Sequence, residues 1–444
     1  MTAKDGRSTA GGRETQGRRS AVSGLEIAPL RGLRYDAARV GKPGNGSARA
    51  VTAPPYDVIS PEEHRRLLDA SPYNIVRITL GTEPGGVSSY AERARLLGEW
   101  VDSGVLRLEE DCLFYVYSID YRAPGGNGAD AEPARRRFLG FTALGKLHPF
   151  AEGVILPHER TFPKVVDDRL KLLEATRANL ESIFLLYSDP SGSVDKLLET
   201  LASGRPAVSV EAKPGEVHAL HPVSDIAAFI RLTDFMSRER PIIADGHHRY
   251  TTSLRYAAET RAGGTAIPGS NWQMMTFTNL HGPGLSILGT HRLVKLRPGA
   301  AKLALERLRK GLEPCEPPDH QLIVETREGK TPVGFPAGIL EGRSGVARTS
   351  YALLHDVVIG EWLRDAIDGE DAIRYFKQGT GEDQALASGE GDILFRMNPV
   401  ERGEFQEVVQ GGELFPHKTT FFYPKLWSGL VIWPIEEPER LALK

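Results

Sequence analysis

The chain has 444 residues, enough for two or three domains that each bury a core of their own. Hydrophobic residues make up 40% of it and charged residues 25%, and its net charge of −3 lacks the basic excess of a general nucleic-acid or membrane-surface binder. Cys112 and Cys315 lie too far apart in sequence for a recognisable metal motif, and no apolar run reaches the roughly 18–20 residues of a membrane span. With no apolar signal-peptide core near residue 1, we expect a cytoplasmic protein.

The first predicted segments are a tail and the start of a globular region. Residues 1–24 carry Gly, Ser, Thr and Arg and almost no large apolar side chain, so they cannot offset their ordering entropy. We therefore predict a disordered tail there. A strand segment at 25–35 follows, and then a helix that begins at Ser60, where an N-cap, a proline and two glutamates succeed one another.

The middle of the chain alternates strands and helices. The pattern predicts strands at 74–80, 113–121, 138–147, 182–187 and 217–220. It predicts helices at 90–103, 165–178 and 194–202, and another within 221–236. A Gly/Ala-rich loop at 124–137 joins two of the strands as a hairpin.

The last third begins with strands at 273–279, 285–289 and 292–296, a helix at 303–312 and a Pro-containing linker at 315–319. Beyond the linker we expect a smaller α/β module over 316–444, with a helix near 356–367 and a final strand at 430–434. Hairpins rather than regular βαβ units make the predicted fold class mixed α+β.

The most informative stretch is Ile242 to Thr251, which predicts a short apolar strand, a turn at Asp245-Gly246 and a helix over about 250–259. Such a junction leaves the first helical N–H groups unpaired. Those N–H groups, the positive end of the helix dipole and the side chains of His247, His248 and Arg249 together favour an anion site, most often for phosphate. The alternative is a strand–turn–helix junction whose histidines are only polar surface.

Several common catalytic motifs are absent. The sequence has no G-x-x-x-x-G-K-[ST] and no strand-bounded G-x-G-x-x-G, which excludes a P-loop enzyme and a plain Rossmann enzyme. It also lacks H-E-x-x-H, G-x-S-x-G and the protein-kinase signatures.

The turn from Asp245 to Tyr250 resembles the phosphate-binding turn of the ParB/sulfiredoxin superfamily, where a Gly, one or two polar residues and an Arg begin a helix. Five motifs in order also resemble a bacterial and archaeal family known only as a domain of unknown function, across about residues 25–434. They are Ala53–Ile59, Pro157–Thr161, Ala244–Tyr250, Thr290–Val294 and Phe422–Leu426.

This resemblance implies a ParB/sulfiredoxin-like nucleotide-binding core with a mixed or antiparallel sheet over residues 25–315. The superfamily includes CTP-binding switches, sulfiredoxin and an archaeal free-serine kinase, in which a carboxylate near a His-Glu-like segment deprotonates the substrate hydroxyl. Glu159 is the matching residue here. Sulfiredoxin has a Cys in its turn where this sequence has a His, so sulfinic-acid reduction is not expected.

The candidate catalytic residues are Glu159, Asp57 and His158. For Glu159 a salt bridge with Arg160 is the alternative, and Asp57 is the rival base, a ligand of a substrate amine or a cap before a helix. The candidate nucleotide and phosphate ligands are Asp245, Gly246, His247, His248, Arg249, His291 and Arg292. Asp245 fits either a Mg²⁺ ligand or a helix cap, and a buried ion pair is the alternative for Arg249.

The expected function is transfer of phosphate from ATP or ADP to a small hydroxyl metabolite, with Mg²⁺ as cofactor and free L-serine as the first acceptor. Phosphoryl transfer needs positioning, charge neutralisation and a base, which these residue types supply. A ParB-like nucleotide switch or an NTPase without a small-molecule acceptor is the alternative. We expect no membrane or nucleic-acid partner and leave a homodimer open.

Overall fold

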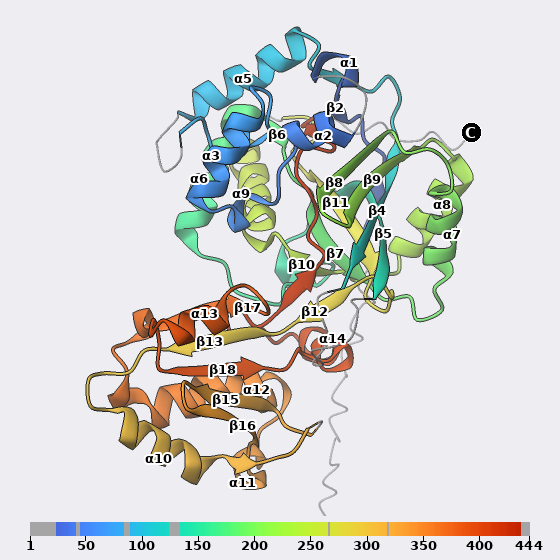
Figure 1. The fold of residues 1–444 in the computed structure, drawn as a ribbon. Coiled ribbons are helices and arrows are strands. Elements are labelled where there is room, and N and C mark those ends of the chain that lie inside the picture. Colours follow the sequence, from blue (N-terminus) through green and yellow to red (C-terminus); the bar gives the residue numbers. More distant parts are fainter. Residues whose placement is uncertain are drawn as a thin grey trace, which may run out of the picture.

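The computed structural model describes residues 24–40, 45–83, 89–123, 134–264, 267–317 and 319–436. The predicted tail, apart from Gly24, and most of the predicted hairpin loop at 124–137 lie outside the described residues. The described residues form two bodies, each built on its own sheet (Figure 1).

The first body holds an eight-stranded mixed sheet, which agrees with the predicted α+β class. Only the β11–β7 pair is parallel, and the other pairs along the sheet are antiparallel. The strand order is β10 (Ile242–Asp245), β7 (Ile183–Tyr187), β11 (Trp272–Asn279), β5 (Arg135–Lys146), β4 (Phe114–Arg122), β9 (Glu216–Val223) and β8 (Val208–Lys213), with β1 (Ile27–Ala28) on β5.

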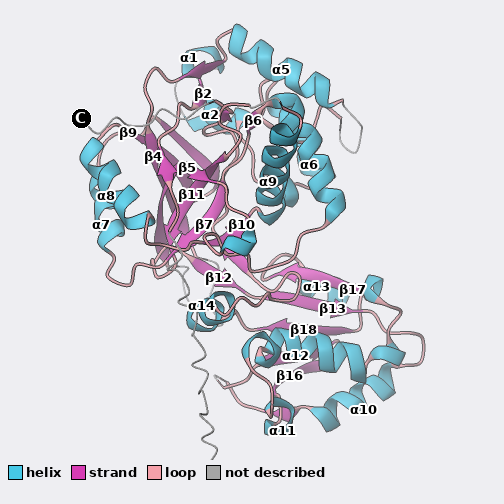
Figure 2. Ribbon diagram, turned by 180° about the vertical axis from the view of Figure 1, so that it is seen from behind, coloured by secondary structure: helices cyan, strands magenta, loops and turns pink. Residues whose placement is uncertain are grey.

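This sheet is covered on both faces, which explains why its central strands are almost continuously apolar. Along β4, Phe114 and Val116 enter one buried cluster while Tyr115 and Tyr117 enter another. Two helices lie to one side of the sheet and two to the other (Figures 1 and 2). They are α7 (Ser193–Leu201) and α8 (Ile226–Met236), and α6 (Pro163–Thr176) and α9 (His247–Ala262).

A small helical layer packs beside α6. The Ser60 hydroxyl accepts a bond of 3.1 Å from the N–H of Glu63, so α3 begins as predicted. The elements of this layer are β2 (Leu33–Tyr35), α1 (Ala37–Val40), α2 (Asn45–Val51), α3 (Pro61–Ala70), α4 (Val76–Thr79), α5 (Tyr90–Asp102) and β3 (Leu106–Leu108).

The strand predicted at 74–80 is wrong, because this segment forms α4. The Asn74 side chain accepts from the N–H of Val76 at 3.0 Å and donates to the carbonyl of Ala50 at 2.8 Å. An Asn that satisfies backbone groups in this way starts a turn, and a short apolar run alone does not distinguish a strand from a buried helix.

The second body is an antiparallel six-stranded sheet with helices. Its strand order is β14 (Glu313–Pro314), β16 (Gly329–Gly334), β15 (Leu322–Thr326), β18 (Ile393–Met397), β13 (Thr290–Val294) and β17 (Ile373–Lys377). Its helices are α10 (Ala301–Gly311), α11 (Ala337–Leu340), α12 (Ser350–Leu353) continued by a π-helix (Leu354–Trp362), α13 (Glu382–Ala387) and α14 (Arg402–Gln410).

The chain enters the second body and later returns to the first. On the way in, β12 (Ser286–Leu288) pairs with β19 (Phe421–Tyr423), and β20 (Trp433–Pro434) then pairs with β6 (Ala178–Asn179) in the first body. The predicted boundary at residue 316 therefore falls inside the second sheet, which already contains β13. The returning segment brings residues near 420 beside β10 and α9.

Candidate functional site

The turn between β10 and α9 requires glycine. Gly246 has φ +94°, and a Cβ there would lie 3.1 Å from the guanidinium carbon of Arg249. L-residues rarely adopt this backbone conformation. The turn lets α9 begin at His247, three residues before its predicted start, so His247 to Arg249 form the first turn of the helix.

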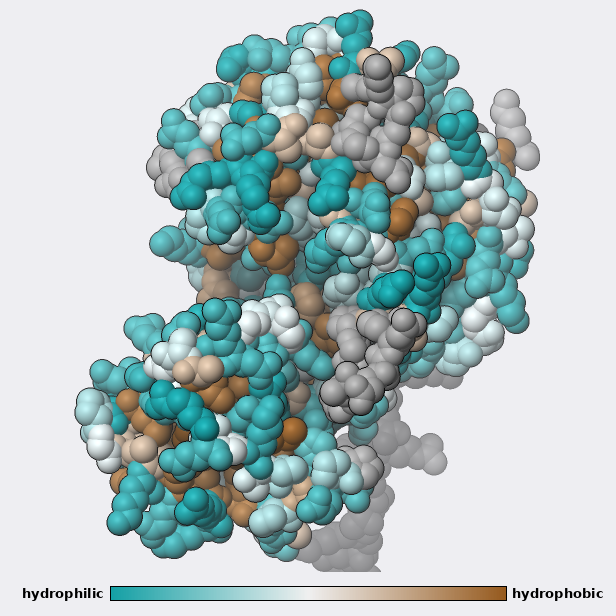
Figure 3. Space-filling model, viewed as in Figure 1, coloured by the Kyte–Doolittle hydropathy of each residue, from teal (hydrophilic) through white to brown (hydrophobic). Residues whose placement is uncertain are grey.

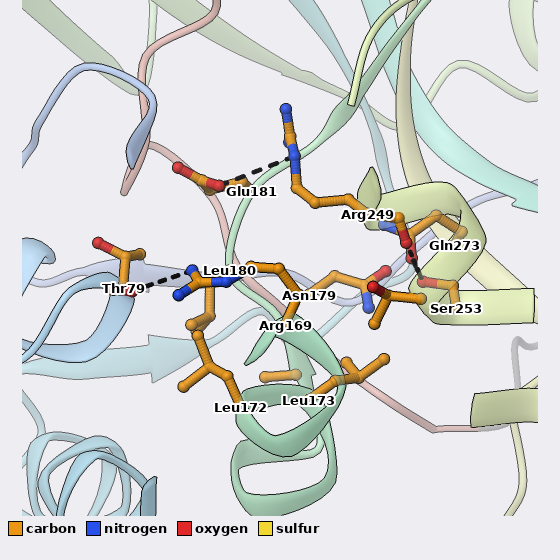
Figure 4. A pocket seen from close by; sticks show the side chains of 12 residues that line it. Thr79, Arg169, Leu172, Leu173, Asn179, Leu180, Glu181, Arg249, Ser253 and Gln273 are labelled. Atoms are coloured by element: carbon orange, nitrogen blue, oxygen red, sulfur yellow. Dashed lines mark hydrogen bonds and ion pairs between the residues drawn. The ribbon is translucent and has the colours of Figure 1, made fainter. Parts of the chain in front are cut away.

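Arg249 lies in an ion-pair cluster, with 14% of its side chain exposed. Its Nη2 donates to Asp245 Oδ2 at 2.8 Å, and its Nε lies 3.9 Å from Glu181 Oε2 (Figure 4). Burial alone would lower the pKa of Arg249, but the Glu181 and Asp245 carboxylates raise it. This geometry is the buried ion pair that the sequence left as the alternative to a phosphate ligand.

Asp245 is shared between two cations. Its Oδ2 accepts from Arg249 and its Oδ1 from Lys425. Burial would raise its pKa, yet the two neighbouring cations hold that pKa well below the usual range. No side chain caps α9, so Asp245 is not a helix cap, and each of its oxygens already contacts a cation of the protein.

Two histidines bridge this turn to the segment that carries Glu159. The His247 ring accepts from the backbone N–H of His158 at 3.2 Å, and its Nδ1 lies 3.3 Å from Glu159 Oε1. His158 Nδ1 donates to the carbonyl of Ile243 at 2.6 Å, and its Nε2 accepts from the Thr420 hydroxyl at 2.8 Å. Burial, followed by the charge of His247, lowers the pKa of His158 to about 3, so its ring is a neutral brace.

His248 has a similar structural role. Its Nε2 accepts from the backbone N–H of Phe162 at 3.0 Å, and the two rings stack with centroids 5.8 Å apart. Burial lowers its pKa. His158 and His248 are therefore neutral at pH 7, so neither supplies a cation at this turn.

Glu159 is the carboxylate that these braces orient. Burial alone would raise its pKa, but the hydrogen bond and charge of His247, with His158 and His417, lower it to about 2. Its side chain remains 24% exposed, so it is ionised at neutral pH and open to a ligand.

Asp57 lies on a 3₁₀ turn (Tyr56–Val58) after two prolines. Asp57 is exposed at the surface, but neighbouring protein atoms remove part of the hydration of its carboxylate. This loss of hydration, followed by the charge of Asp245, raises the pKa of Asp57. The backbone N–H of Tyr56 and the hydroxyl of Ser428 both donate to Glu181, at 3.2 and 2.7 Å. The structure thus brings Asp57 beside the Asp245 turn.

Three lysines come from the second body and the returning segment. Lys377 ends β17, Lys418 lies in the loop before β19, and Lys425 follows β19. The ammonium groups of Lys377 and Lys425 lie 4.5 and 5.0 Å from the ring centroid of Phe421. The sequence gave no signal for Lys377, which is far along the chain from the turn at Gly246.

His291 and Arg292 do not join the turn, although the sequence placed them with the phosphate ligands. His291 accepts from the N–H of Met397 at 3.2 Å inside the second sheet. Arg292 is fully buried, with its guanidinium carbon 4.9 Å from the Tyr351 ring centroid. Its Nη2 donates to the carbonyl of Lys418 at 3.0 Å, so it supports the loop that carries this lysine.

Two cavities adjoin the ion-pair cluster. The larger, of about 60 Å³, lies between α6 and α9 and is lined by Arg249, Glu181, Asn179 and Gln273 among others (Figure 4). That is room for about four waters or one small chemical group. The smaller, of about 10 Å³, touches Asp245 and Lys425. A space-filling view shows the indentation between the two bodies (Figure 3).

The described ranges contain no group of three or more His, Cys, Asp or Glu side chains placed to hold a metal ion by themselves. In the same ranges no helix is both long enough and apolar enough to cross a bilayer.

Comparison with solved structures finds weak similarities. A staphylococcal protein, SbnI from Staphylococcus aureus with a C-terminal truncation, is 15% identical, with a TM-score of 0.37, over 67% of this chain and 91% of its own. A free serine kinase variant in complex with ADP is 15% identical, with a TM-score of 0.31, over 60% and 83%. A conserved hypothetical protein from Pyrococcus furiosus is 15% identical, with a TM-score of 0.29, over 60% and 86%. At these scores no activity carries over to this chain.

Comparison with curated proteins gives no match. The sequence profile of the DUF1015 family, described as a protein of unknown function, matches residues 27–336. The match spans the first body and the first strands of the second, and it ends before Lys377, Lys418 and Lys425. This chain belongs to the DUF1015 family.

Proposed function

We propose that this protein is a nucleotide-dependent phosphotransferase that acts on a small hydroxyl metabolite, with free L-serine as the first candidate acceptor and ATP or ADP as the donor. The observation that carries the proposal is the Glu159 carboxylate, held ionised by His247 on the first turn of α9. This arrangement places a carboxylate that can accept a hydrogen bond from a substrate hydroxyl beside a helix N-terminus that favours phosphate. The same proposal includes that the first body is a ParB/sulfiredoxin-like domain.

Glu159 and Asp57 divide the work at the acceptor. A general base is most effective when its pKa is near the working pH. The pKa of about 2 suits Glu159 to accepting a hydrogen bond from the acceptor hydroxyl and orienting it. The raised pKa of Asp57 makes this residue the rival base. In phosphoryl transfer, orienting the nucleophile is itself a large part of the catalytic task.

Phosphate binding falls to groups that the protein has not already paired. Arg249 donates to Asp245 and to the carbonyl of Ser182, so it stabilises the turn rather than serving as the main phosphate ligand. The N–H groups at the start of α9 remain suited to an anion, and His248 keeps Nδ1 as a further polar contact.

Magnesium fits this site as an ion that arrives with the nucleotide. Mg²⁺ in nucleotide enzymes is held by one or two carboxylates together with substrate phosphates, so a complete protein cage is not needed. Asp57 is the carboxylate with free oxygens beside Asp245, and it would hold the ion or a substrate amine. When bound, the ion would neutralise charge on the phosphate oxygens.

Turnover and binding measured on matched variants test the proposal. Purified protein is incubated with Mg²⁺, ATP or ADP, and L-serine or other hydroxyl acids, and phosphorylated acceptor and spent nucleotide are quantified. Glu159→Gln keeps the shape but removes the charged carboxylate that orients the acceptor hydroxyl or takes its proton, so turnover should fall by about 10²–10⁴ while nucleotide affinity changes little. Glu152→Gln is the matched control, because Glu152 also contacts a histidine, His148, at 2.7 Å outside the site.

Three results would count against the proposal or redirect it. Nucleotide binding without any phosphorylated acceptor, together with nucleotide-driven dimerisation in light scattering, would favour the alternative of a ParB-like switch. Full activity of Glu159→Gln with loss of activity in Asp57→Asn would assign the base to Asp57. No binding of any nucleotide by the wild type would end the proposal.

A further inference from the structure

Lys377 and Lys418 lie side by side on the second body. In the β13–β17 pair, Thr290 is directly opposite Lys377. The hydroxyl of the same Thr290 donates to the carbonyls of Lys418 and Thr419. The register therefore places the Lys418 loop against the end of β17. Burial and the charges of Lys425 and Lys418 lower the pKa of Lys377, while the carboxylates of Asp57 and Asp245 raise it, so this lysine lies within electrostatic reach of both groups of charges.

The Lys418 backbone is held in a conformation that a lysine rarely adopts. Its φ is +53°, in the left-handed region that is unfavourable for an L-residue. Bonds from Arg292 and Thr290 to its carbonyl stabilise this conformation. Such strain concentrates at ligand clamps, where surrounding contacts hold it in place.

Lys377, Lys418 and Arg292 contact rings and carbonyls rather than carboxylates. The Lys418 ammonium lies 5.1 Å from the Tyr375 ring centroid and the Arg292 guanidinium carbon 5.2 Å from the same centroid. Among the residues that the structure describes, none of these three side chains forms an ion pair with an acid. Arg292 is buried and Lys377 half-buried, whereas Lys418 is exposed. The more distant carboxylates of Asp57 and Asp245 offset only part of the cost of burying the Lys377 ammonium, and a bound anion would offset more of it. Lys425 differs, because Asp245 neutralises it.

We propose that Lys377 and Lys418 form a clamp on the second body for the polyphosphate chain of a nucleoside di- or triphosphate, with Arg292 as the residue that positions Lys418. The clamp deepens the proposed function and rests on it for the identity of the nucleotide. The acceptor-side carboxylates of the first body and this clamp then face the same ligand from opposite sides of the cleft. A nucleoside monophosphate reaches fewer of these charges than a diphosphate does.

Isothermal titration calorimetry of the full chain tests the clamp. ADP, AMP and inorganic pyrophosphate are titrated separately, each in the presence of Mg²⁺. Lys377→Met should weaken ADP and pyrophosphate binding by about tenfold or more, and AMP binding by less. Lys302→Met is the matched control, since Lys302 is an exposed lysine on α10.

Lys418→Gly separates charge from backbone strain. Glycine adopts φ +53° without strain, so this variant should be at least as stable as the wild type. If Lys418 had only a structural role, its replacement would leave ADP binding unchanged. We expect ADP affinity to fall about tenfold while the melting temperature holds or rises. ADP binding within twofold of wild type in both Lys377→Met and Lys418→Gly would overturn the clamp and leave the proposed function standing.

The wild-type titrations distinguish the two proposals. The wild type could bind pyrophosphate but no nucleotide, with pyrophosphate binding weakened in both lysine variants. This result would keep the clamp as a polyphosphate site and remove the proposed function. Absence of binding for every ligand would remove both.

Discussion

Two walls flank the indentation between the bodies, the Asp245 turn on the first body and the Lys377–Lys418 pair on the second, and they differ in how their charges are neutralised. On the first body, Asp245 and Glu181 are matched by Arg249, Lys425 and hydrogen-bond donors. On the second body, the ammonium groups of Lys377 and Lys418 lie over aromatic rings and form no ion pair with an acid among the described residues. The first wall is complete without a ligand, and the second is not. A wall whose charges are already paired gives rigidity, and a wall of cations without acids gives affinity for an anion.

The largest effect should come from breaking the first wall at its centre. Arg249→Met leaves Asp245 and Glu181 as buried carboxylates with too few cations, and removing one partner of a buried pair costs about 3–5 kcal/mol. We expect the free energy of unfolding in chemical denaturation to fall by that amount. Arg255→Met on the same helix is the control, because its pairs with Asp167 and Glu259 are exposed and should change stability by less than about 1 kcal/mol.

Equal stabilities of the Arg249 and Arg255 variants would contradict the reading of the first wall as a paired, rigid unit. A stable Arg249→Met variant with lost nucleotide affinity would instead restore Arg249 as a phosphate ligand.

Gly246→Ala should have the next largest effect. Alanine meets both an unfavourable φ of +94° and the Arg249 guanidinium at 3.1 Å. We expect a loss of about 1–3 kcal/mol in the free energy of unfolding, together with weaker nucleotide binding as the helix start shifts. Gly299→Ala is the matched control, because Gly299 has φ +80° with nothing within 4 Å of the added Cβ. Equal losses of stability in both variants would show that backbone strain alone acts and that the contact with Arg249 adds nothing, and unchanged nucleotide affinity in Gly246→Ala would show that the turn does not contact the nucleotide.

Acid should loosen the braces before it protonates the carboxylates. The folded pKa of His158, about 3, lies below its usual 6.5, so the unfolded chain takes up the proton first as pH falls. Its contribution to stability is complete above pH 6.5 and is lost progressively as the pH falls from 6.5 towards 3. His158→Asn keeps a donor for the carbonyl of Ile243 and removes the titration. Between pH 7 and 5 it should flatten the slope of unfolding free energy by up to about 1.4 kcal/mol per pH unit.

Denaturation curves at pH 7, 6 and 5 measure this slope. Glu159 does not confuse the result, because its lowered pKa of about 2 affects stability only below about pH 4.5, the usual value for a glutamate. Parallel slopes in wild type and His158→Asn would mean that His158 is not held neutral.

The sequence predicted what is local and missed what is assembled from distant segments. Asp245, Gly246 and the helix start are consecutive, so turn chemistry and period alone predicted the strand, the turn and the helix. The partners of Arg249 are not local: Glu181 comes from a loop before β7 and Lys425 from the returning segment. No periodicity indicates that Arg249 meets carboxylates before it meets a phosphate. The lysine wall depends on the register of β13 and β17, which a single chain does not reveal.

The smallest effect should come from the hydrogen bond that joins the two walls. The hydroxyl of Thr420 donates to His158 Nε2 at 2.8 Å and ties the loop after Lys418 to the brace behind Glu159. Thr420→Val keeps the shape and removes the donor, so we expect the free energy of unfolding to fall by about 0.5–1.5 kcal/mol. Thr200→Val is the control, because its hydroxyl bonds only to the carbonyl of Lys196 on an exposed helix face. If the walls act on one ligand, Thr420→Val should also weaken ADP binding and slow turnover together, whereas separate walls would leave both unchanged.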